Sequence, residues 1–219
     1  WTIDVHLQPG VAGTDSPASV QFKAALHRVR GKAPEISSEA QAGSLVDALK
    51  GLDFEVRKVD RKRRRRNPSP PFITSTLQQE AARKLRFTAK QTMSVAQRLY
   101  EGIELGAEGA TGLITYMRTD STRLSPDAVK EVREYIKVHY GKDYLPEKPA
   151  SYKSREGAQD AHEAIRPTDV HRNPEQVAPY LSGEQLKLYT LIWKRFVASQ
   201  MSPAVLAQTT VDIAAGDFV

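Results

Sequence analysis

One short stretch holds the residues best suited to chemistry: Tyr116, Arg118 and Asp120 alternate with Met117 and Thr119. In an extended chain the first three share one face, which places a phenol, a guanidinium and a carboxylate together. A tyrosine hydroxyl has a pKa of about 10 in water, so it needs a cation or a proton acceptor to act as a nucleophile. Arg118 can stabilise a phenolate or grip a phosphate, and Asp120 either orients Arg118 or caps the following turn. From spacing alone, an ordinary surface Tyr–Arg pair is the preferred interpretation.

A second candidate group lies within residues 159–167, which read QDAHEAIRP. His162 and Glu163 resemble the start of an H-E-x-x-H zinc helix, but Arg166 occupies the place of the second histidine, so this zinc motif is excluded. We expect a short helix over residues 159–165, which puts His162 and Arg166 on one face with donors suited to a phosphate. A capping histidine beside a salt-bridged Arg166 is the alternative interpretation.

Composition narrows the classes of protein that could hold these residues. The 219 residues include no cysteine, which excludes disulfides, a thiol nucleophile and cysteine-ligated metals. No apolar run approaches the roughly 20 residues that cross a bilayer, so no membrane role is expected. The net charge of +6 favours polyanionic partners. The chain starts at Trp1 without the pattern of a signal peptide, and we expect it to be a piece of a larger protein.

The first part of the chain is predicted to be a sheet with one helix. Apolar residues alternate over residues 1–7 and again near 20–24, with a turn at 10–17, and helical spacing covers 37–49 before Gly51. A strand from Phe54 runs into the block 57–66, which has eight basic residues and one acid, and prolines follow it. We place a domain boundary near Asn67 and interpret the block as a solvated linker or a phosphate-contacting arm.

Helical spacing dominates the middle of the chain. Capping boxes at Ser75 or Thr76, at Thr88 and at Ser182, and the Ser125-Pro126 pair, each predict a helix start. We expect an exposed connector over residues 103–111, a strand over 112–117, and strand character again over 209–219. The fold class is therefore α+β, with a mainly helical domain (68–203) inserted in an antiparallel β domain (1–67, with a helix near 37–50, and 204–219).

Three long motifs identify a family that the chain resembles. They are PFITSTLQQ from Pro71, ITYMRTDS around Tyr116, and AHEAIRP around His162. Together they resemble bacterial type IA DNA topoisomerases over residues 70–203. The resemblance implies that Tyr116 is the nucleophile, that Arg118 lies beside it and that His162 lies near the bound DNA backbone. It further implies active-site or DNA contacts for a set of residues around them: Gln97, Glu101, Thr119, Asp120, Arg123 and Arg166.

The resemblance also implies an activity, for which other domains of the protein supply the metal ligands. The family cuts one DNA strand through a 5′-phosphotyrosine, passes a strand and reseals, which relaxes negative supercoils without ATP. Its Mg²⁺ ligands, a glutamate and a D-x-D pair, belong to another domain, and no two aspartates here have that spacing. We therefore expect the chain to be an inactive fragment holding the catalytic tyrosine domain and parts of a β arch domain. Its expected partners are single-stranded or negatively supercoiled DNA and its missing domains, in the cytoplasm at the nucleoid.

Two other classes of function fit the composition. A non-catalytic DNA-binding module would use the arginine block and the helices for affinity, with Tyr116 as a structural residue. A protein-interaction piece would dock an acidic partner on residues 61–66.

Overall fold

The computed structural model describes residues 1–8, 21–152 and 162–219. It combines helices with antiparallel strands, which confirms the predicted α+β class. Contacts divide the chain into two units, one formed by Trp1–Arg64 with Leu206–Val219 and the other by Arg65–Val205. The predicted turn at residues 10–17 and the first part of the predicted 159–165 helix lie outside the described residues.

The first unit contains a short hairpin and one helix. Strand β1 (Asp4–Leu7) pairs antiparallel with β2 (Phe22–Ala25). Helix α1 (Glu39–Leu49) starts after Ser38, whose hydroxyl accepts the amide of Gln41, so the predicted helix is confirmed. A small core lies between them, formed by Ile3, Leu49 and Ala215. Trp1 was expected on the apolar face, but it is 69% exposed because it precedes the paired part of the strand.

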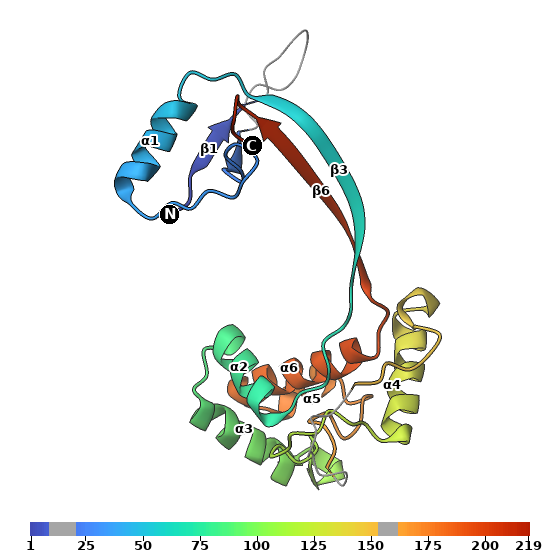
Figure 1. Ribbon diagram of the computed structural model, residues 1–219. Helices are drawn as coiled ribbons and strands as arrows, with labels where there is room; N and C mark the ends of the chain where they lie inside the picture. The colour runs from blue at the N-terminus through green and yellow to red at the C-terminus, as the bar shows by residue number, and fades with distance from the viewer. Residues whose placement is uncertain (9–20, 153–161) are drawn as a thin grey trace. The chain divides into compact units, whose positions relative to one another are not determined.

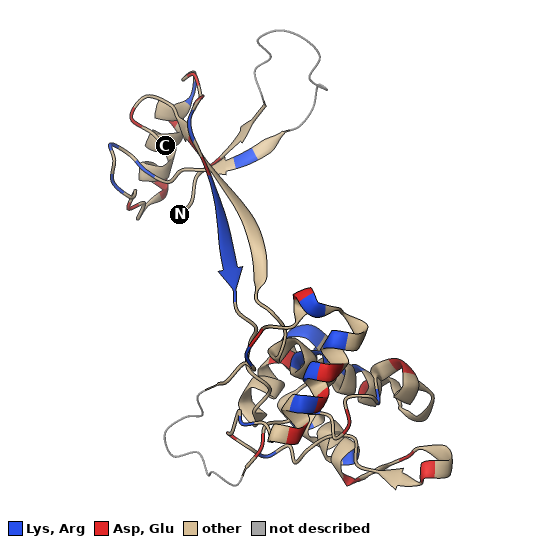
Figure 2. Cartoon of the chain, turned by 90° about the vertical axis from the view of Figure 1, so that its right-hand side faces the viewer, with Lys and Arg blue, Asp and Glu red and all other residues tan. Residues whose placement is uncertain are grey.

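A long ribbon of two strands follows. Strand β3 (Glu55–Arg66) pairs with β6 (Ala204–Ala214), as Figure 1 shows. The basic block is solvated, as the linker interpretation expected, but it is a paired strand up to Arg66. Each side chain from Arg61 to Arg66 is exposed, so the charges stay in water while the backbone pairs. Figure 2 shows β3 as a basic strand beside β6, which carries one charged residue, Asp212.

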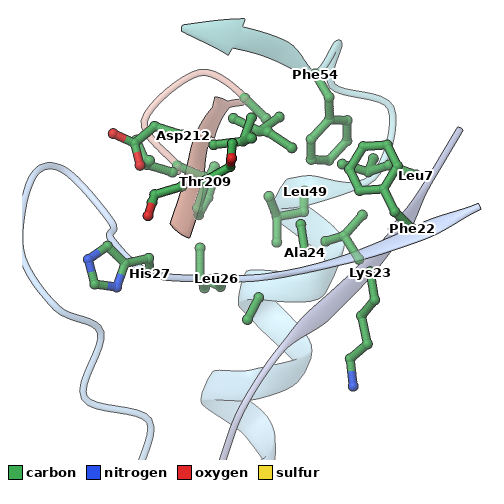
Figure 3. A pocket seen from close by; sticks show the side chains of 18 residues that line it. Leu7, Phe22, Lys23, Ala24, Leu26, His27, Leu49, Phe54, Thr209 and Asp212 are labelled. Carbon is green, nitrogen blue, oxygen red and sulfur yellow. The ribbon is translucent and has the colours of Figure 1, made fainter. Parts of the chain in front are cut away.

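The first unit also holds an apolar cavity of about 660 Å³ (Figure 3). Leu7, Phe22, Leu49 and Phe54 are among its lining residues. None of the residues around Tyr116 or His162 that the sequence predicts for the active site lines this cavity.

The second unit is helical. Its helices are α2 (Thr74–Leu85), α3 (Ala89–Glu101), α4 (Pro126–His139), α5 (Pro174–Val177) and α6 (Gly183–Ser199). Helix α6 contacts α2, α3 and α5. Its buried face contains Leu188, Tyr189, Ile192, Trp193, Phe196 and Val197. Among the described residues, no helix is long and apolar enough to cross a membrane.

Three of the predicted helix starts are confirmed and one is wrong. Thr88, Ser125 and Ser182 cap α3, α4 and α6 through their hydroxyls. Helix α2 starts earlier than predicted, with Ile73 at its N-cap position. Thr76 is its third residue, and the Thr76 hydroxyl accepts the amide of Ile73 at 3.1 Å.

Three segments near the motifs differ from the prediction. The connector at residues 103–111 contains the hairpin β4 (Ile103–Glu104) and β5 (Ala110–Thr111), because Ile103 and Leu105 are buried. Residues 112–117 form one isolated bridge, between Ile114 and Pro167, instead of a strand, and the chain bends at Met117 and Arg118. The described part of the predicted 159–165 helix is not helical, and Ile165 forms a bridge with Phe72.

Candidate active site

Backbone hydrogen bonds hold the Tyr116 segment between α3 and the segment of residues 162–168. On one side, the amide of Leu113 donates to the carbonyl of Leu99 in α3 at 2.7 Å. On the other side, the amide of Thr115 donates to the carbonyl of Arg166 at 2.9 Å, and that of Thr168 to Leu113 at 3.0 Å. The segment is therefore fixed without belonging to a sheet.

The hydroxyl of Thr115 adds a second tie immediately before Tyr116. It donates to the carbonyl of Ala164 at 2.7 Å and accepts the amide of Arg166 at 3.0 Å. One side chain thus satisfies two backbone groups of the neighbouring segment. This pairing joins the tyrosine motif to the AHEAIRP motif, although the two lie about 50 residues apart in the chain.

The hydroxyl of Thr74, the first residue of α2, fixes the segment after Tyr116. It donates to the carbonyl of Met117 at 2.7 Å and accepts the amide of Thr119 at 2.9 Å. The amide of Thr74 also donates to the carbonyl of Thr119 at 2.9 Å. Met117 is fully buried, so its side chain anchors the segment in the core. The PFITSTLQQ motif therefore meets the tyrosine motif at this point.

The predicted alternation of faces is confirmed. Met117 and Thr119 are buried, whereas Tyr116, Arg118 and Asp120 are exposed, with Tyr116 at 45%. Among the described residues, Arg118 and Asp120 make no hydrogen bond or salt bridge, so Asp120 neither orients Arg118 nor caps α4, whose N-cap is Ser125. Within the described ranges, the Arg118 guanidinium therefore has no carboxylate partner.

The ring of Tyr100, from α3, packs against Tyr116. Their centroids are 5.3 Å apart with the planes at 63°, an edge-to-face pair. Tyr100 is 41% exposed. Gly112 makes this arrangement possible, since a Cβ there would lie 2.7 Å from the carbonyl oxygen of Tyr100.

Arg166 forms a salt bridge with Glu163. Its Nε and Nη2 atoms donate to the two carboxylate oxygens, each at 3.0 Å, as the alternative interpretation described. The amide of Ser125 donates to the same carboxylate at 2.6 Å. Burial acts to raise the pKa of Glu163, but the hydrogen bonds from Arg166 and Ser125 outweigh it, and the pKa lies below its ordinary value. Glu163 therefore ties the start of α4 to this segment.

The other candidate residues lie around these ties. His162 is half-buried directly before Glu163, and Arg123 is exposed while its carbonyl accepts the amide of Ala164 at 2.8 Å. Gln97 donates to Glu101 at 2.6 Å on α3, the helix that carries Tyr100. Because residues 159–165 form no helix where they are described, His162 and Arg166 do not share a helical face.

Comparisons with known proteins match this arrangement to one family. The family model described as DNA topoisomerase matches residues 1–219. The chain belongs to the type IA DNA topoisomerases. DNA topoisomerase 1 from two strains of Xylella fastidiosa is 61% identical over 160 residues, which cover 73% of this chain and 20% of each relative. The full-length topoisomerase I of Thermotoga maritima superposes with a TM-score of 0.70 at 38% identity, covering 89% of this chain and 30% of that one.

This topoisomerase chain thus spans about a fifth of the length of its curated relatives. Within the described ranges, no group of three or more His, Asp or Glu side chains could hold a metal ion.

Sequence reasoning missed the residues that hold the topoisomerase site together. Thr74 and Thr115 carry no signal of their own, because a threonine hydroxyl is as common on a surface as in a tie between segments. The signal that could have found Thr74 is its place within the PFITSTLQQ motif, which the resemblance had already selected.

The close approach at Gly112 predicts the effect of a single added methyl group. Gly112→Ala should displace the Tyr100 carbonyl, lower the free energy of unfolding by about 1–3 kcal/mol, and shift the ring resonances of Tyr100 and Tyr116. Urea unfolding and NMR measure the two effects. Gly183→Ala is the matched control, since nothing lies within 4 Å of the added carbon there. Equal stabilities for the two variants would contradict the described contact.

The lowered pKa of Glu163 predicts a pH dependence. The stability that Glu163 contributes is complete above the ordinary carboxyl pKa of 4.5 and is lost as the pH falls through the lower pKa of the folded state. Glu163→Gln should therefore cost about 1–2 kcal/mol of unfolding free energy at pH 7 and progressively less below pH 4.5. Urea unfolding at several pH values gives this difference, and a difference independent of pH would refute the ion pair.

Proposed function

We propose that this chain supplies the nucleophile with which a type IA topoisomerase cuts one strand of DNA. The hydroxyl oxygen of Tyr116 attacks a backbone phosphorus, an O–P bond forms, and the bond from phosphorus to the 3′ oxygen breaks. The DNA 5′ phosphate is then joined to Tyr116, and the proton lost by the phenol is balanced by one gained at the departing 3′ hydroxyl. The observation that carries this proposal is an exposed phenol on a segment fixed on both sides.

Arg118 is the proposed electrostatic partner of Tyr116. It shares the exposed face, and within the described part of the chain it has no carboxylate partner. A guanidinium can donate two parallel hydrogen bonds to a phosphate and stabilise the charge that develops there during attack. Arg166 differs, because Glu163 already occupies its fork. We therefore assign transition-state stabilisation to Arg118 and a positioning role to Arg166.

The reaction conserves the energy of the broken bond in the phosphotyrosine, so the 3′ hydroxyl can reseal the strand without ATP. In the full-length protein, passage of a strand before resealing would relax negative supercoils. The chain alone is proposed to be inactive, with its Mg²⁺ ligands and other domains elsewhere in the longer protein. When bound, Mg²⁺ would supply positive charge at the reacting phosphate. The proposed substrate is single-stranded or negatively supercoiled DNA.

A second function is favoured by one observation, the exposure of the basic residues along β3. Arg61–Arg66 could bind phosphates on any DNA without chemistry, in which case affinity would fall steeply with salt. The two functions differ in whether a covalent bond to DNA forms. Docking of an acidic protein on the same strand is tested by measuring DNA binding with that protein added as a competitor.

Replacing the nucleophile tests the main proposal. Full-length protein incubated with labelled single-stranded DNA and Mg²⁺, then denatured, should retain a covalent adduct that Tyr116→Phe abolishes. Tyr100→Phe is the matched control, because it removes a hydroxyl from the neighbouring ring, and the adduct should persist. An adduct that survives Tyr116→Phe assigns the nucleophile to another residue.

A change at Arg118 separates chemistry from binding. Arg118→Lys keeps the charge but loses the planar fork, so the rate of cleavage should fall by 10-fold or more, on the order of 1.4 kcal/mol, with a much smaller loss of DNA affinity. Single-turnover cleavage and fluorescence anisotropy measure the two quantities. Equal losses in rate and affinity would show that Arg118 acts only in binding.

A further inference from the structure

A polar pocket of about 230 Å³ lies in the second unit, apart from the residues around Tyr116. One face of α2, one residue of α6 and the chain before α2 line it. The lining residues are Ser69, Thr76, Gln79, Glu80, Arg83 and Arg195. A cavity of this size can hold a tetrahedral anion together with water.

The charges at this pocket do not balance. Glu80 is the carboxylate, with 14% of its side chain exposed, and it meets Arg83 at 2.6 Å, Lys84 at 2.7 Å and Arg195 at 2.8 Å. Burial acts to raise the pKa of Glu80, but the Lys84 hydrogen bond and the charges of Arg195, Lys84 and Arg83 outweigh it, so the pKa is lowered. Three cations therefore surround one ionised carboxylate, which leaves positive charge for a second anion.

Arg195 is a rigid part of the pocket. Its side chain is 17% exposed, its guanidinium lies 4.4 Å from the centre of the Phe72 ring, and it donates to the carbonyl of Pro70 at 3.3 Å. Arg83 differs, because 71% of its side chain is exposed and one of its nitrogens is bonded to Glu80. The pocket thus pairs a fixed guanidinium with one whose remaining N–H groups can reach a ligand.

Two further donors line the pocket. Among the described residues, the Ser69 hydroxyl and the Gln79 side-chain amide take part in no hydrogen bond. Thr76 is different, since its hydroxyl already accepts the amide of Ile73. A phosphate has acceptor oxygens on several sides, which matches a hydroxyl, an amide and guanidinium N–H groups around one cavity. The Glu80 carboxylate does not prevent phosphate binding, because Arg83 and Lys84 each bind one of its oxygens.

We propose that this pocket binds one phosphate group of a nucleic-acid strand, at a site separate from that of Tyr116. The assignment of the phosphate to DNA rests on the proposed function, whereas the phosphate chemistry rests on the pocket alone. Such a site would hold the strand at a second point of the same unit, as sequence-independent phosphate contacts do.

The test uses NMR on the 219-residue chain, titrated in turn with inorganic phosphate and with an oligothymidylate. Both ligands should shift the Ser69 amide and the Gln79 side-chain amide in a saturable manner. Arg83→Gln should weaken phosphate binding about three- to tenfold and reduce the salt dependence of oligonucleotide binding by about 0.7 in the log–log slope. Arg83→Lys should retain that slope, which separates lost charge from lost structure.

Lys130→Gln on α4 is the control, since it removes an exposed charge outside the pocket and should leave the Ser69 and Gln79 shifts unchanged. Phosphate titrations that move neither resonance, or an Arg83→Gln variant that binds phosphate as the parent does, would overturn the site. Phosphate binding without any oligonucleotide effect at these residues would overturn the assignment to nucleic acid. Adduct formation by the full-length protein is independent of all three results, so it tests Tyr116 separately.

Discussion

The active-site segment depends on one constraint: residues 112–119, which bend at Met117 and Arg118, must be held in place without the ladder of a sheet. Buried backbone groups without partners are costly, so the neighbours have to supply every bond. Thr115 and Thr74 do this on either side of Tyr116 with side-chain hydroxyls that both donate and accept. Met117 adds an apolar anchor between them. The consequence is a tyrosine that projects from a rigid backbone, which is what a nucleophile that must meet a phosphorus atom requires.

Two arginines near this segment have different environments, and that difference assigns their roles. Arg166 is largely buried and lies 3.0 Å from its partner Glu163. Because Glu163 also accepts the amide of Ser125, this ion pair joins the start of α4 to the 162–168 segment. Arg118 is exposed, and within the described residues it has no carboxylate partner. At Glu80, in contrast, cations outnumber the carboxylate. Electrostatic balance, more than the number of basic residues, thus distinguishes positions that hold the fold from positions that can hold a ligand.

Sequence patterns predicted the parts of the fold that depend on interactions between residues close together in the chain. The helix starts at Thr88, Ser125 and Ser182 were predictable, because a capping hydroxyl acts within three residues. The start of α2 was not, since Thr74 is held by residues more than 40 positions away. Residues 112–117 have the composition of a strand, but their backbone groups bond to α3 and to the 162–168 segment. Strand β3 continues through its arginines because a solvated ribbon tolerates charge on both faces.

Mapping the covalent bond tests the central claim most directly. Trypsin should release residues 99–118 as one peptide, since no Lys or Arg lies between Arg98 and Arg118. After the full-length protein is trapped on single-stranded DNA and the DNA is digested, mass spectrometry of this peptide should place a nucleotide phosphate on Tyr116, joined through its 5′ end. A phosphate on Tyr100, in another peptide, or joined through a 3′ end would contradict the account.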